Sequence, residues 1–108
     1  MVRKLPKDVG AQIVARQLAR SGTGIGSNVE EAQSAQSRVE FARKMNIALS
    51  EAREAHYWLR LAGEAGITKQ DLTAAITQEA HELVSILTVV VKRTREGNRK
   101  KLNRSEKK

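Results

Sequence analysis

The sequence predicts an all-α protein built as an antiparallel up-down helix bundle. Three observations support this prediction. Apolar residues recur at intervals of three and four over long stretches. The chain of 108 residues has a single proline, and helix start and stop signals separate the apolar stretches. The length fits one small domain, which we place at residues 1–96, with residues 97–108 as a disordered basic tail.

The clearest helix is predicted over residues 38–65. Its apolar residues are spaced by 4, 3, 4, 3, 4 and 3 positions, a pattern that no strand produces. These residues are Phe41, Met45, Ala48, Ala52, Ala55, Leu59 and Ala62. Ser37 and Glu40 have the spacing of a capping box at the helix start. A glycine C-cap is expected at Gly63 or Gly66.

A second helix is predicted from a capping-box-like start at Thr68 to about Arg95, with its stop at Gly97. Its apolar residues recur at helical spacing, as Leu72, Ala75, Ile76, Leu83, Ile86, Leu87, Val90 and Val91. Residues 83–91 are apolar around most of the helix circumference, and such a helix is buried on more than one side. In so small a domain, we therefore expect a subunit interface as well as a core.

Residues 8–36 form the most ambiguous segment. Apolar residues from Val9 to Ala32 fit one helical face, but Gly22, Gly24 and Gly26 interrupt it, each at a cost of roughly 1 kcal/mol relative to alanine. Either the helix breaks at residues 21–27, or the glycines allow a neighbouring helix to approach closely. We favour one continuous helix with a weak middle.

The net charge of +8 is concentrated at the C-terminal end. Residues 92–108 contain nine basic and two acidic residues, a net charge of +7, whereas residues 1–91 contain eleven basic and ten acidic residues, a net charge of +1. Such a segment is typical of proteins that bind a polyanion, here RNA, DNA or a ribosome. The alternative is a solubilising end with no specific partner. The candidate phosphate-binding residues are Lys92, Arg93, Arg95, Arg99, Lys100, Lys101, Arg104, Lys107 and Lys108.

Polar residues on otherwise apolar stripes indicate a buried network. Asn28, Glu51 and Glu54 are its candidates, with Arg20 and Arg53 as expected partners, because unpaired glutamates among apolar neighbours are costly. A carboxylate pair for metal binding is the alternative, but di-iron bundles require Glu-x-x-His on two helices, and this pattern is absent from the sequence. Structural pairing is the better interpretation, and we predict no metal site.

No constellation in the sequence predicts catalysis or a cofactor. The three glycines read G-x-G-x-G without a preceding strand, which is not a phosphate-binding loop. The chain has no cysteine, and its two histidines, His56 and His81, accompany no nucleophile motif. Tyr57 and Trp58 are better interpreted as packed residues than as a base-stacking platform. No apolar run approaches the roughly 20 residues of a membrane span, so we expect a cytoplasmic protein that does not enter a membrane.

Three stretches together resemble a known family. They are Leu5-Pro6-Lys7, the segment from Arg20 to Ala32 with its pattern R-S-x-x-x-I-x-x-N-x-x-E-A, and the run from Phe41 to Leu59. The last contains Glu51-Ala52-Arg53-Glu54 and Tyr57-Trp58-Leu59. In these motifs the chain is similar to the four-helix-bundle proteins encoded in 23S rRNA intervening sequences, and to the accessory variability determinant proteins of diversity-generating retroelements. The resemblance covers nearly all of residues 5–95.

The resemblance implies a homopentameric barrel of four-helix subunits with a basic surface for nucleic acid, no enzymatic activity and, in retroelement members, a reverse transcriptase partner. In this chain only residues 1–5 correspond to the first helix of the family, so we expect three helices, an upstream in-frame helix and an exposed apolar groove. We therefore expect a non-enzymatic, RNA- or ribosome-associated homo-oligomer. The alternative is a protein-interaction scaffold such as a reverse-transcriptase accessory subunit.

Overall fold

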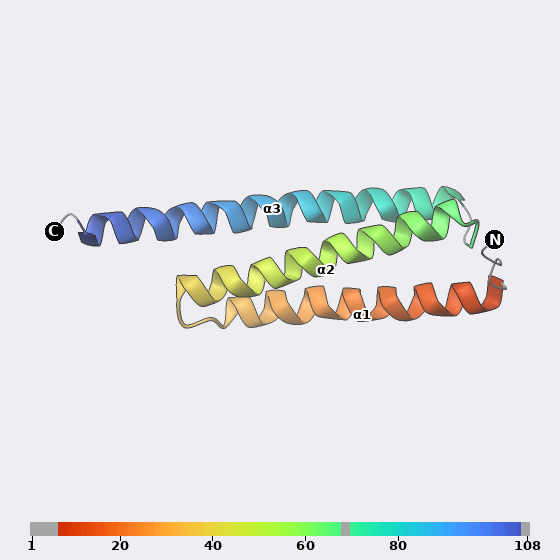
Figure 1. Cartoon of the computed structure of the whole chain (residues 1–108), viewed down its shortest axis with the longest axis horizontal. Coiled ribbons are helices and arrows are strands. Elements are labelled where there is room, and N and C mark those ends of the chain that lie inside the picture. Colours follow the sequence, from red (N-terminus) through yellow and green to blue (C-terminus); the bar gives the residue numbers. More distant parts are fainter. Residues whose placement is uncertain (1–6, 68–69, 107–108) are drawn as a thin grey trace, which may run out of the picture.

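The computed structural model describes residues 7–67 and 70–106, and this part of the chain forms three helices and no strand. Helix α1 spans Lys7–Gln33, α2 spans Arg38–Glu64 and α3 spans Gln70–Glu106. Successive helices run in opposite directions, and α2 lies between the other two (Figure 1). The all-α prediction is confirmed, and the described part of the chain has three helices rather than the four that the family resemblance implies.

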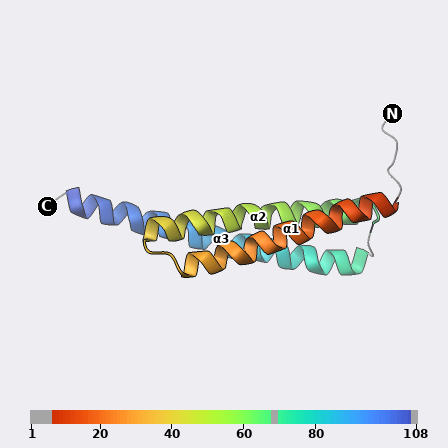
Figure 2. The same ribbon diagram turned by 90° about the horizontal axis from the view of Figure 1, so that it is seen from below.

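The three helices form an open layer and not a closed bundle. Helix α2 packs against both neighbours, whereas the described residues of α1 and α3 do not pack against each other. The last turns of α3 project beyond the connection between α1 and α2, as both views show (Figures 1 and 2). Each outer helix therefore has one packed side and a large surface without a neighbour.

Helix α1 is continuous through its three glycines, as predicted. The close approach that was the alternative explanation for them also occurs, but at Gly24 alone. A Cβ atom at this position would lie 3.0 Å from the Cγ and Cδ atoms of Glu51 on α2, while Gly22 and Gly26 have nothing within 4 Å of theirs. A side chain would therefore crowd its neighbour at only one of the three positions.

Helix α2 has the caps that the sequence predicts. The Ser37 hydroxyl accepts a hydrogen bond of 3.1 Å from the Glu40 backbone N–H. At the other end Gly66 has a φ of +68°, and the Ile67 N–H donates to the Ala62 carbonyl at 3.0 Å. This is a glycine C-cap with a 6→1 hydrogen bond. Most of the predicted apolar stripe is buried, as Met45, Ala48, Ala52, Ala55 and Ala62.

Helix α3 is longer than predicted. Its expected cap at Thr68 lies outside the described residues, and the predicted stop at Gly97 is wrong, since the helix continues to Glu106. Gly97 keeps a negative φ, and a glycine within a helix costs only about 1 kcal/mol. Residues 98–106 consist mostly of good helix formers. Residues 97–106 are therefore helical here rather than a disordered tail.

The core lies along α2, where all three helices contribute. Its buried members are Ala32 of α1, Met45, Ala48, Leu49 and Ala52 of α2, and Leu87 and Val91 of α3. Large apolar side chains remain exposed on every helix, and they are Val9, Ile13, Val39, Ile47, Tyr57, Ile76, Ile86 and Val89. The predicted exposure of apolar surface thus occurs among the described residues of this three-helix array.

One stretch of the described helices, Thr73–Gly97 of α3, is long and apolar enough by length and composition to cross a membrane. Its apolar runs are short, as the sequence predicts, but the residues between them are mostly uncharged. Little of the stretch is buried within the chain. A helix whose apolar surface is covered by another protein has the same composition.

Candidate nucleic-acid interface

A basic groove lies between α2 and the C-terminal half of α3. It has a volume of about 410 Å³. Its lining residues from α2 are Asn46, Leu49 and Arg53, and those from α3 are Thr88, Val91, Lys92, Arg95, Glu96 and Arg99. Leu49 and Val91 are buried core residues and form an apolar floor. The groove therefore combines a rigid base with cationic side chains.

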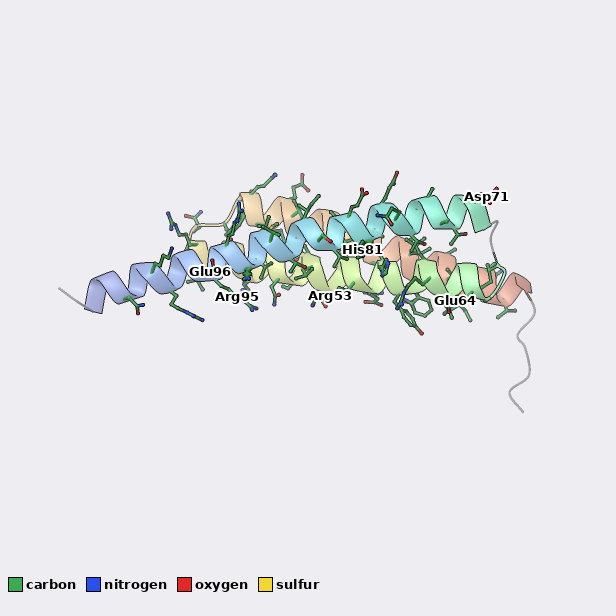
Figure 3. All side chains as sticks on the ribbon, turned by 90° about the horizontal axis from the view of Figure 1, so that it is seen from above. Arg53, Glu64, Asp71, His81, Arg95 and Glu96 are labelled. Atoms are coloured by element: carbon green, nitrogen blue, oxygen red, sulfur yellow. The ribbon has the colours of Figure 1, made fainter. Side chains whose placement is uncertain are left out.

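Helical spacing brings three of the cations to one side of α3. Lys92, Arg95 and Arg99 follow each other by three and four positions, so they share one helix face. This face borders α2, and Arg53 of α2 lies along the same groove (Figure 3). The groove thus collects four positive charges from two helices against one carboxylate, that of Glu96.

The four cations are available for an external anion. None of the described carboxylates forms an ion pair with them, since the ion pairs of the described residues involve only Arg20 and Lys44 as cations. Arginine and lysine side chains in such a position neutralise phosphates and carry no base specificity. The arrangement is a candidate interface for a nucleic-acid backbone.

The other predicted phosphate-binding residues are placed differently. Arg93 and Lys100 are exposed but do not line the groove. The backbones of Lys101 and Arg104 belong to α3, although their side chains lie outside the described ones. Lys107 and Lys108 lie outside the described residues. The groove therefore uses only part of the predicted basic segment.

Arg53 belongs to this groove and not to the polar network in which the sequence placed it. The sequence predicts Arg53 as a partner of Glu51 and Glu54, but Arg53 faces α3 rather than α1. The physical reason is helix rotation: Arg53 lies four positions after the α3-facing Leu49, whereas Glu51 and Glu54 lie on the side facing α1. The spacing of four positions between Leu49 and Arg53 is the sequence signal that places both residues on one face of α2.

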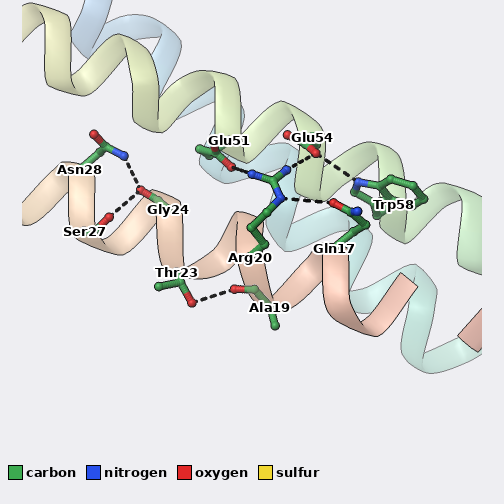
Figure 4. Close-up of polar contacts among 10 residues, drawn as sticks. All are labelled: Gln17, Ala19, Arg20, Thr23, Gly24, Ser27, Asn28, Glu51, Glu54 and Trp58. Atoms are coloured by element: carbon green, nitrogen blue, oxygen red, sulfur yellow. Dashed lines mark hydrogen bonds and ion pairs between the residues drawn. The ribbon is translucent and has the colours of Figure 1, made fainter. Parts of the chain in front are cut away.

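The predicted polar network forms between α1 and α2 around Arg20. Its guanidinium donates to Glu54 and, at 3.5 Å, to Glu51, which lies one turn earlier on α2 (Figure 4). Gln17 and Trp58 complete the cluster, the first by accepting from Arg20 and the second by donating to Glu54. The Arg20 side chain is 51% exposed, so this network lies at the edge of the interface and is not buried.

Electrostatics in this cluster follow from its geometry. The hydrogen bond from Arg20 lowers the pKa of the Glu54 carboxyl below its usual range, with a smaller contribution from Trp58. Asn28, the remaining predicted member, donates instead to the Gly24 carbonyl at 2.8 Å within its own helix. The cluster therefore links α1 to α2, and Arg20 contacts both of its carboxylates.

Two histidines meet at the α2–α3 interface, midway along it. The ring centroids of His56 and His81 are 5.8 Å apart and the ring planes are inclined by 44°. Burial lowers the pKa of His56, and the nearby Arg60 and His81 lower it further. No group of three or more potential metal-ligating side chains occurs among the described residues.

Comparison with known proteins identifies the family. The family model of the 23S rRNA-intervening sequence protein matches residues 1–89. The chain belongs to this family. It is also similar to the crystal structure of a protein of unknown function from the S23 ribosomal protein family of Bacteroides thetaiotaomicron, with 39% sequence identity, coverage of 74% of each chain and a TM-score of 0.70. No curated protein matches the chain. The resemblance predicted from the sequence motifs is confirmed.

Proposed function

We propose that this family member is a non-enzymatic cytoplasmic protein that binds the phosphate backbone of RNA, free or within the ribosome, as a homo-oligomer. The observation that carries the proposal is the groove between α2 and α3, in which Arg53, Lys92, Arg95 and Arg99 have no described ion-pair partner. Four unpaired cations along one groove repel each other, and a polyanion relieves that repulsion.

The composition of the groove favours backbone binding over base recognition. No aromatic side chain lines it, and stacking platforms for single strands require exposed rings beside the cationic groove. Tyr57 and Trp58 lie edge to face, with ring centroids 5.3 Å apart, and are outside its lining. We therefore expect strong salt dependence and little sequence preference.

Oligomer formation is proposed from the uncovered apolar side chains. Ile86 is 60% exposed and Val89 47% exposed on the most apolar part of α3, and contiguous apolar surface of this kind typically marks an interface. The family resemblance favours a homopentamer. Several copies of the basic groove in one particle would multiply the phosphate contacts.

The test is a fluorescence anisotropy titration with a labelled RNA at several salt concentrations. Arg53→Ala and Arg95→Ala are expected to weaken binding and to reduce the slope of log affinity against log salt by about one for each lost phosphate contact. Arg16→Ala and Arg43→Ala remove the same charge from exposed positions outside the groove and outside the basic segment. Equal losses in all four variants, or no binding by the wild-type protein at low salt, would disprove the assignment of the groove.

A protein-interaction scaffold, such as a reverse-transcriptase accessory subunit, is the second candidate. The observation that favours it is the exposed apolar surface on all three helices. Joint replacement of Arg53, Lys92 and Arg95 by alanine separates the two candidates. RNA binding falls steeply if the groove supplies the phosphate contacts, while capture of a protein partner is retained.

A further inference from the structure

We propose that His56 and His81 form a binding site for one divalent transition-metal ion that links α2 to α3. The two residues are the only histidines of the chain. They come from different helices and lie 25 positions apart in the sequence, yet the antiparallel packing of α2 and α3 brings their rings together. Neutral imidazole is the most common protein ligand for such ions.

The distance between the rings suits a shared ion. Two imidazoles bound through nitrogens at 2.0–2.1 Å would have ring centroids about 5.2 Å apart in a tetrahedral site and about 6.4 Å apart in a linear one. The observed 5.8 Å lies between these values. The spacing of the two rings is therefore compatible with one nitrogen of each ring binding the same ion.

The position of the pair leaves room for the remaining ligands. His81 is exposed and His56 only half-buried, so water or an anion reaches the site from solvent. Along the interface, the pair lies between the basic groove and a second pocket, which Arg60, Gly63 and Thr73 help to line. Figure 3 shows His81 between the labelled Arg53 and Glu64. An open coordination sphere with two protein nitrogens suits Zn²⁺, Ni²⁺ or Cu²⁺ rather than the oxygen-preferring Mg²⁺ or Ca²⁺.

Arg60 limits the affinity of this site. Its positive charge acts on His56 and opposes a bound cation. We therefore expect weak, reversible binding by the wild-type protein and tighter binding by Arg60→Gln. This increase is specific to an ion held beside His56, because adventitious binding elsewhere on the chain does not respond to this substitution.

The site is tested by titrating the untagged full-length protein with ZnCl₂, using calorimetry together with the imidazole ¹H–¹⁵N signals. The expected result is one saturable site per chain with both histidine signals shifting together. His56→Ala and His81→Gln each weaken binding by more than the roughly 10-fold that loss of an outer-shell partner typically costs. A change in the chemical shifts of only one histidine during the titration would overturn the proposal. Unchanged zinc affinity in either variant would also overturn it.

An equimolar mixture of the two single-histidine variants distinguishes a site within one chain from a site between copies. The proposal expects no recovery of affinity in the mixture, since each chain lacks one ligand. Recovery would show that the histidines of different copies share the ion and would overturn the intrachain site. Helix content measured by circular dichroism verifies that His81→Gln, a change at an exposed position, leaves the fold intact. Neither outcome depends on RNA binding, so the result is independent of the proposed function.

Discussion

Gly24 of α1 packs so closely on Glu51 of α2 that a Cβ atom at position 24 would come within 3.0 Å of two atoms of the Glu51 side chain. The same carboxylate is held by Arg20, which also binds Glu54. Close backbone approach and ion pairing therefore coincide at one point of the α1–α2 interface. Because a shift of Glu51 away from Gly24 also changes its 3.5 Å contact with Arg20, we expect this point of the interface to be sensitive to a single methyl group.

Alanine substitutions at the three glycines of α1 test this contact. Gly22→Ala and Gly26→Ala add a methyl group where nothing lies within 4 Å, so each is expected to stabilise the protein by about 0.5–1 kcal/mol through higher helix propensity. Gly24→Ala is expected to be at least about 1 kcal/mol less stable than Gly22→Ala, because Glu51 must move. Urea denaturation measures the difference, and equal stability of all three variants would contradict the close approach.

The pairing of Glu54 predicts a pH dependence of stability. Arg20 lowers the pKa of Glu54 in the folded protein, so the unfolded state binds this proton more readily. The stabilisation is therefore fully present above the unfolded-state pKa and is lost as the pH falls through the lower folded-state pKa. The melting temperatures of wild type and Glu54→Gln are expected to differ at pH 7 and to converge below about pH 4, the usual range of a glutamate pKa.

Glu30→Gln is the matched control for this pH series. Glu30 is exposed and pairs with none of the described cations, so its removal is expected to leave the difference from wild type nearly constant over the same range. A difference in melting temperature between wild type and Glu54→Gln that stays constant from pH 7 to pH 3 would contradict the prediction. It would show that the charge of the Glu54 carboxylate does not contribute to stability.

The substitution Ser21→Ala is expected to increase the stability of the protein. The Ser21 side chain is fully buried, and its hydroxyl has no hydrogen-bond partner in the part of the chain that the structure describes. An unsatisfied buried hydroxyl costs about 1–3 kcal/mol, so Ser21→Ala should raise the free energy of unfolding by about 1 kcal/mol. Ser27→Ala, at an exposed position of the same helix, should change it by less than about 0.5 kcal/mol. A clear loss of stability in Ser21→Ala would show that the hydroxyl is satisfied.

Local signals explain which parts of the fold the sequence predicts correctly. Three features of α2 depend only on residues within one or two helical turns, and they are the spacing of its apolar stripe, the Ser37 cap and the Gly66 cap. Such local features can be predicted from the sequence. Gly97 shows the limit of such signals. A glycine ends a helix when it adopts a left-handed conformation, and here continuing the helix is compatible with its negative φ.

Contacts between helices explain what the sequence does not reveal. Glu51 and Arg53 are two positions apart, yet one faces α1 and the other α3. Spacing alone places them on different faces but does not identify the neighbour of each face. The meeting of His56 and His81 is likewise invisible, because it depends on the register of two antiparallel helices. These placements require the packed structure.

The uncovered apolar surface of α3 leads to the last prediction. Ile86 is exposed in the isolated chain, so Ile86→Asp should leave the helical content unchanged while placing a charge in any interface that covers this residue. We expect the wild-type protein to be an oligomer by size-exclusion chromatography with light scattering and the variant to have a lower mass. Ser85→Asp adds the same charge at the neighbouring exposed position and serves as the control.

The same variant links assembly to RNA binding. If several grooves act together, loss of the oligomer lowers the apparent affinity for a long RNA by about 10²–10⁴-fold, although every residue of the groove is still present. Affinity for an RNA short enough to occupy a single groove should stay within a few-fold of wild type, because each subunit keeps its four cations. A monomeric wild-type protein would contradict the proposed oligomer and would assign the apolar side of α3 to a different partner. Equal losses of affinity for long and short RNA would show that RNA binding does not depend on several grooves acting together.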